Sequence, residues 1–146
     1  MSASAVVSVR LSQDQAGRLR QMAKRLGRTA SEVGAQLLSE SLRKAEFTFV
    51  EFRDSPVGRQ AYIQGSRLTV WQVISLLREY QGEVAKVAEH LRWPEAKIHA
   101  AISYSQSYPD EIEEAIKDNE SCDFEKLARL LPGIQRFEAK APKKSQ

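Results

Sequence analysis

The sequence contains a single cysteine, Cys122, and no long apolar run, and each of these absences excludes a class of protein. One cysteine cannot form a disulfide within the chain, which is typical of a cytoplasmic protein. No stretch approaches the ~18 consecutive apolar residues of a membrane-spanning helix, and we expect no signal peptide. The 146 residues, 42% hydrophobic and 28% charged, predict a soluble cytoplasmic protein of one ordinary domain or two small ones.

Motifs of catalysis and metal binding are missing as well. The sequence has no glycine-rich phosphate loop and no nucleophile motif. His90 and His99 stand nine residues apart, with Cys122 far beyond them, and this spacing matches no metal site. The acidic run at residues 110–120 is more typical of a solvated helical face than of a cation site. We therefore predict no enzymatic activity, no cofactor and no bound metal.

The formal net charge is only +3, but the charges are unevenly distributed. Residues 1–46 carry eight Lys/Arg against four Asp/Glu, and residues 121–146 carry six against three. Between them, residues 110–120 carry one lysine against six acidic residues. A basic beginning and a basic tail around an acidic segment indicate an anionic partner at one end of the molecule.

Two helices are predicted near the start of the chain. The first spans residues 13–26, with apolar residues at helical spacing, and Gly27 ends it where a left-handed conformation is needed. Thr29 and Glu32 then form the pattern of a capping box at the start of the second helix. The apolar stripe of that helix comprises Val33, Leu37, Leu38 and Leu42.

Before these helices, residues 6–12 (VVSVRLS) alternate apolar and polar positions, the pattern of a strand with one buried face. No second strand follows for more than thirty residues, so this strand has no partner nearby in its own chain. Two chains that pair their strands antiparallel would bury Val7, Val9 and Leu11 beneath a two-stranded ribbon. The ribbon would present Val6, Ser8 and Arg10 outward. We therefore predict an intertwined homodimer.

Such a ribbon fits the major groove of DNA, where arginine and serine can bind base edges. The free amides at the start of the second helix are suited to bind a phosphate, and Lys24 and Arg28 add positive charge beside them. Residues 5–45 resemble a ribbon-helix-helix domain of the CopG/Arc/MetJ type. The resemblance implies base readout by Val6, Ser8 and Arg10 and phosphate binding by Thr29, Ala30 and Ser31. The alternative is a dimerisation ribbon without DNA contact.

Residues 47–120 are predicted to open with a β-hairpin around the turn D-S-P-V-G, followed by helices. Pro94 is expected at the first position of the third of these helices, and residues 110–116 should form a last short one. Residues 50–116, including Gly58, Arg59 and Tyr62, resemble the helix-turn-helix domain of VapB-type antitoxins. Arg92 stands where that turn usually has glycine. Glu95 and a single lysine make a poor DNA surface, so an auxiliary role is favoured.

Residues 121–146 form a tail in which apolar and basic residues alternate. The resemblance to VapB-type antitoxins implies that such a tail binds a PIN-type ribonuclease toxin, with Arg129, Arg136 or Lys140 reaching its acidic site. The predicted toxin-binding residues are Phe124, Leu127, Arg129, Leu131, Ile134, Arg136 and Phe137. The tail could instead dock on the preceding domain.

The fold class expected is mainly α with a small β component. It comprises a ribbon-helix-helix domain (1–46), a helix-turn-helix domain of the antitoxin type (47–120) and a partner-binding tail (121–146). The function expected is that of an antitoxin of a type II toxin–antitoxin pair, which represses its own operon as a DNA-bound dimer. The alternative is a free-standing transcriptional regulator without a toxin partner.

Overall fold

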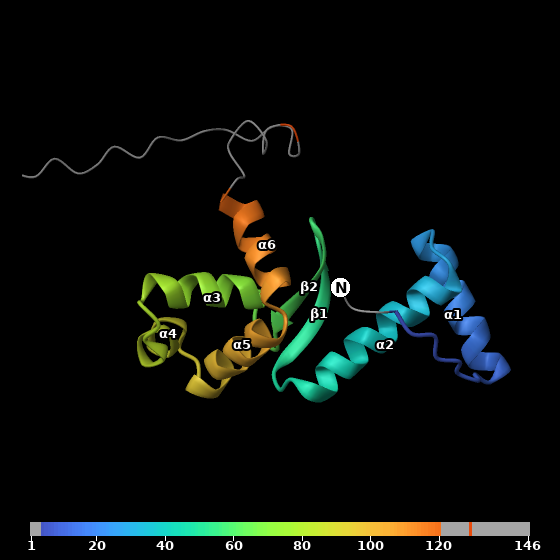
Figure 1. The fold of residues 1–146 in the computed structure, drawn as a ribbon, viewed down its shortest axis with the longest axis horizontal. Coiled ribbons are helices and arrows are strands. Elements are labelled where there is room, and N and C mark those ends of the chain that lie inside the picture. The colour runs from blue at the N-terminus through green and yellow to red at the C-terminus, as the bar shows by residue number, and fades with distance from the viewer. Residues whose placement is uncertain (1–3, 121–128, 130–146) are drawn as a thin grey trace, which may run out of the picture. The chain divides into compact units, whose positions relative to one another are not determined.

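The computed structural model describes residues 4–120 and Arg129 (Figure 1). In this part of the chain it contains six helices and one two-stranded antiparallel sheet, which confirms the mainly α fold class with a small β component. The chain divides into two compact units, Met1–Gln64 and Gly65–Gln146. The division places the hairpin with the first two helices, whereas the sequence grouped it with the helices that follow.

The first unit begins with the two predicted helices, α1 (Gln13–Leu26) and α2 (Ala30–Glu46). Each is preceded by a complete capping box, formed by Ser12 with Gln15 before α1 and by Thr29 with Glu32 before α2. Gly27 ends α1 with φ 63°, a left-handed conformation that glycine adopts without a steric penalty. The predicted span of α1 and the predicted start of α2 are therefore confirmed, and the capping box of Ser12 with Gln15 is an additional local signal.

The hairpin follows α2 directly and comprises β1 (Val50–Ser55) and β2 (Gly58–Ile63). The strands pair antiparallel with Val50 opposite Ile63 and Ser55 opposite Gly58. Val50 and Ile63 are buried, whereas Val57 in the turn is 78% exposed. The hairpin predicted around this turn is confirmed.

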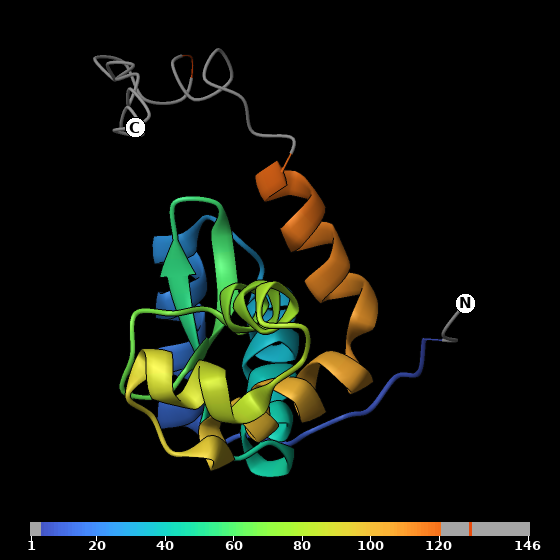
Figure 2. The same cartoon turned by 90° about the vertical axis from the view of Figure 1, so that its left-hand side faces the viewer.

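The second unit contains α3 (Val70–Glu79), α4 (Val84–Leu91), α5 (Glu95–Ser107) and α6 (Pro109–Glu120) (Figure 2). Helix α3 packs on α4, α5 and α6. Buried side chains come from all four helices: Val70, Val73, Ile74, Val87, Ala88, Ile98, Ala101, Tyr104, Ile112 and Ile116. Arg78 of α3 donates hydrogen bonds to the carboxylate of Glu113 of α6, and this lowers the pKa of Glu113.

Two details of this unit differ from the sequence prediction. Pro94 caps α5 from outside rather than occupying its first turn. The last helix is longer than the predicted residues 110–116, since it begins at Pro109 and continues to Glu120. Proline lacks an amide hydrogen but fits the start of a helix, so Pro109 ends α5 and begins α6.

Arg92 links α4 to α5 in a left-handed conformation, with φ 56° and ψ 44°. Its amide donates to the carbonyl of Glu89, and the amide of Trp93 donates to the carbonyl of Ala88. These are the C-capping hydrogen bonds that a glycine at this position usually permits. The Cβ atom of a non-glycine residue makes this conformation unfavourable. The turn between α4 and α5 is therefore closed at an energetic cost.

Arg92→Gly is expected to raise the free energy of unfolding by about 0.5–1 kcal/mol, because glycine relieves the strain of the left-handed turn. The matched variant Arg92→Ala removes the same charge but keeps a Cβ atom, and should not stabilise. Urea unfolding can be followed by tryptophan fluorescence, because both tryptophans of the chain, Trp71 and Trp93, lie in this unit. Equal stabilisation by both variants would assign the effect to the lost charge instead.

Candidate nucleic-acid interface

Residues 4–11 form no helix or strand in the single chain and are exposed throughout. The exposed fractions are 97% for Val6, 77% for Val7, 67% for Val9 and 42% for Leu11. Figure 2 shows this segment as a drawn-out chain that runs to the N-terminus. The predicted strand is therefore not formed within one chain, because a strand requires a hydrogen-bonded neighbour. Its pairing with a second copy stays a prediction.

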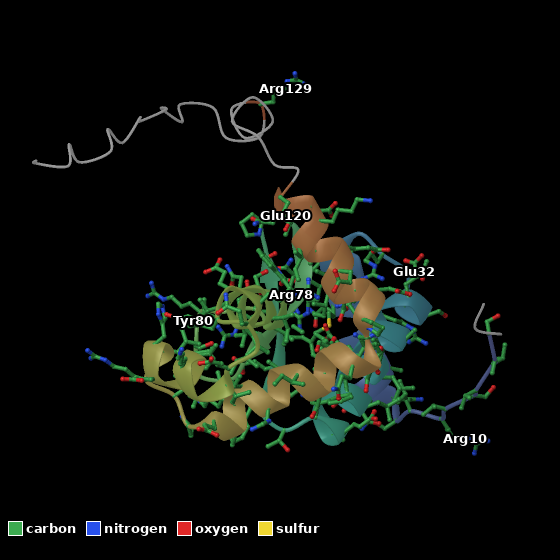
Figure 3. All side chains as sticks on the ribbon, turned by 60° about the vertical axis from the view of Figure 1, so that its left-hand side comes forward. Arg10, Glu32, Arg78, Tyr80, Glu120 and Arg129 are labelled. Carbon is green, nitrogen blue, oxygen red and sulfur yellow. The ribbon has the colours of Figure 1, made fainter. Side chains whose placement is uncertain are left out.

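The polar candidates on this segment are Ser8 and Arg10, both exposed. In Figure 3 the side chain of Arg10 points away from the ribbon into solvent. Arg10 makes no ion pair with the described residues, so its guanidinium group keeps its donors for an external acceptor. Arginine with a free guanidinium group is the side chain best suited to contact guanine or phosphate.

The second group of candidates lies at the start of α2. The Thr29 hydroxyl accepts a hydrogen bond from the Glu32 amide, and the Glu32 carboxylate accepts one from the Thr29 amide, both at 3.1 Å. The amides of Ala30 and Ser31 have no acceptor among the described residues. These two amides, at the positive end of the helix dipole, are suited to bind an anion such as a phosphate.

Two basic side chains flank this helix start. Lys24 is exposed in the last turn of α1, one turn before Gly27. Arg28 donates a hydrogen bond to the side chain of Gln36, and its Nε atom lies 3.8 Å from the Glu32 carboxylate. Helices α1 and α2 pack together, so the structure brings Lys24, Arg28 and residues 29–31 to one end of the pair. Val6, Ser8 and Arg10 lie apart from them, on the extended segment.

The turn of the second unit presents a weaker surface for an anion. On α5, Glu95 and His99 are exposed, while the amino group of Lys97 lies 5.6 Å from the centre of the Trp93 ring. On α4, His90 accepts or donates a hydrogen bond with the Tyr80 hydroxyl at 2.7 Å. Helix α5 therefore carries no strongly basic face, and the auxiliary role expected for this unit stays a prediction.

Most of the predicted toxin-binding residues lie outside the described residues: Phe124, Leu127, Leu131, Ile134, Arg136 and Phe137. Arg129 is described, in a helical conformation with an exposed side chain. In the described part of the chain, no three His, Cys, Asp or Glu side chains group as metal ligands would. None of the helices described there combines the length and the apolar character needed to cross a bilayer.

The sequence did not identify the ion pair that fixes the hairpin to α2. Arg59 of β2 donates to both carboxylate oxygens of Glu40, at 2.6 and 3.3 Å, and lies 3.4 Å from Asp54. The hydrogen bond that Arg59 donates to Glu40 raises the pKa of Arg59 above its ordinary value. The resemblance pointed to Arg59 but gave it no partner, and no local pattern joins residues nineteen positions apart.

No family model, curated protein or solved structure matches this chain.

Proposed function

We propose that this protein is a dimeric, sequence-specific DNA-binding antitoxin. The observation that carries the proposal is the distribution of exposed apolar side chains. Of the nine large apolar side chains that are exposed among the described residues, eight lie between Val6 and Leu42. In α1 and α2, only Ala23 and Val33 are buried. So small a core cannot stabilise this helix pair alone, and a second copy supplies the missing apolar partner.

The same dimer accounts for the unpaired segment 4–11. Antiparallel pairing with its own copy satisfies the backbone groups of both segments and turns Val7, Val9 and Leu11 toward the helices. The opposite face then carries Ser8 and Arg10 from each chain, in a two-stranded ribbon of the size that the major groove admits. The amides of Ala30 and Ser31, with Lys24 and Arg28, hold the flanking phosphates.

The toxin-binding part of the proposal has its support in the sequence of the tail and in the resemblance to VapB-type antitoxins. Basic residues such as Arg129 and Arg136 alternate with apolar ones, as in a segment that covers an acidic cleft. The second candidate function is a regulator without a toxin. It shares the dimer and the DNA surface, so the two differ only in the role of residues 121–146.

The test compares the full chain with a chain that ends after Glu120 and retains α6. Each is co-expressed with the product of the adjacent open reading frame, and cell growth and DNA protection at the chain's own promoter are measured. We expect both chains to protect an inverted repeat, because the site mirrors the two-fold symmetry of the protein. Only the full chain should neutralise a toxic ribonuclease. Equal protection from toxicity by the shortened chain would reject the tail as the toxin-binding segment.

A further inference from the structure

A groove of about 500 Å³ lies in the first unit between α1, α2 and the hairpin. Its floor is apolar and consists of Met22 and Leu26 from α1 and Val33 and Leu37 from α2. Leu26 is 53% exposed and Leu37 is 40% exposed, so the floor is open to solvent in the single chain. Asp54 and Arg59 of the hairpin contribute to its wall.

The hairpin wall is held in place rather than free to move away. Arg59 binds Glu40 with two hydrogen bonds, and the side chain of Glu40 is only 12% exposed. Phe47, which joins α2 to the hairpin, is buried, and the guanidinium carbon of Arg43 lies 5.9 Å from the centre of the Phe52 ring. The hairpin and the helix pair therefore present one preformed surface.

Helix α2 exposes two rows of leucines and small side chains beside this groove. Leu37, Ser41 and Ala45 form one row and Leu38 and Leu42 the next, and all five residues are exposed. We call these five residues the α2 face. Leu37 belongs both to this face and to the groove floor, so the two apolar surfaces are continuous. Small side chains at Ser41 and Ala45 allow another helix to approach closely.

The occupant of this surface must be apolar and large enough to cover both the groove and the α2 face. Two of the three arginines that line the groove have acidic partners, since Arg59 is paired with Glu40 and Asp54 and Arg28 lies 3.8 Å from Glu32. The third, Arg25, makes no ion pair with the described residues. A small anion could be held by Arg25, but it would leave the exposed leucines of the groove floor and of α2 uncovered. A second copy of α2 offers leucines of the required kind, and a two-fold axis lets each copy fill the groove of the other.

We propose that the β1–β2 hairpin is part of the dimer interface, because the groove it completes receives the α2 face of a second copy. The inference rests on the proposed dimer but goes beyond the ribbon and helices that define it. The hairpin then helps to decide which chains pair, since a related chain lacking the Asp54 and Arg59 wall presents a different groove.

The test is a cross-linking experiment between two differently substituted full-length chains, both with Cys122→Ser. One chain carries Asp54→Cys in the groove wall, and the other carries Ser41→Cys in the α2 face. Because each chain has one thiol, a short bis-maleimide that joins unlike chains reports a contact between copies. The matched control is Ser39→Cys, at another exposed serine of α2 that lies outside both rows. We expect Ser41→Cys to cross-link to Asp54→Cys at least tenfold faster than Ser39→Cys does.

Sedimentation of the same samples separates the possible failures. If the protein is a dimer but Ser41→Cys and Ser39→Cys cross-link to Asp54→Cys equally slowly, the hairpin is not part of the dimer interface. The proposed function would be unaffected by that result. A monomer at every concentration would overturn the dimer itself, and with it the proposed function.

Discussion

Val9→Asp is expected to abolish the dimer, with the association constant falling by more than a hundredfold. In the single chain Val9 is 67% exposed, and a surface substitution there should change stability by no more than about 0.5 kcal/mol. In the paired ribbon the same side chain lies beneath two strands, where an unpaired carboxylate costs about 3 kcal/mol or more. Sedimentation equilibrium over a wide range of protein concentration measures the change.

Val6→Asp is the matched control for this prediction. It makes the same chemical change three residues earlier, at a side chain that is 97% exposed and lies on the outer face of the proposed ribbon. We expect its dimer to be unchanged, although its affinity for DNA should fall because the new charge faces phosphates. If Val9→Asp dimerises as well as Val6→Asp, residues 6–12 do not form the ribbon.

Arg10→Ala is expected to weaken binding to the operator by about 5- to 150-fold, which corresponds to the ~1–3 kcal/mol of a bidentate arginine–guanine contact. The affinity for the cognate site should fall, and the preference for one base should be relaxed at one position in each half-site. Arg10→Lys keeps the charge but not the two-pronged geometry, so it should retain non-specific affinity and lose discrimination. Titrations with operator DNA and with scrambled DNA at fixed salt concentration measure the specific and the non-specific affinity.

Arg20→Ala provides the control for net charge, because Arg20 is exposed on α1 and its loss removes one positive charge from the same unit. Arg20→Ala should reduce the affinity for operator DNA and for scrambled DNA by the same small factor. Undiminished operator binding by Arg10→Ala, together with loss on Lys97→Ala, would transfer base readout to α5. That outcome would reverse the roles proposed for the two units.

The parts of the fold that the sequence predicted well are those fixed by local chemistry. The end of α1 follows from Gly27 and the start of α2 from the capping box of Thr29 and Glu32, whose interactions span only three or four residues. The hairpin turn at residues 55–58 is local in the same sense. Each of these features can be predicted without knowledge of the rest of the chain.

The features that the sequence did not predict depend on contacts between distant residues or on a balance of energies. The attachment of Arg59 to Glu40 makes the hairpin part of the first unit, and no periodicity reports it. At Arg92, local propensity argued against a left-handed turn, but the packing of α4 on α5 outweighs a penalty of about 1–2 kcal/mol. Residues 6–12 alternate in sequence as a strand does, but within one chain they lack the neighbour that would make them a strand.

The antiparallel pairing of residues 6–11 between two copies can be tested by an isotope-filtered NOE experiment on dimers that combine one ¹³C,¹⁵N-labelled chain with one unlabelled chain. Only contacts between copies give signals in this experiment. The paired ribbon predicts interchain contacts between backbone protons of residues 6–11, in the alternating pattern of antiparallel strands. A dimer without interchain contacts from this segment, or a protein that remains monomeric, would rule out the paired ribbon.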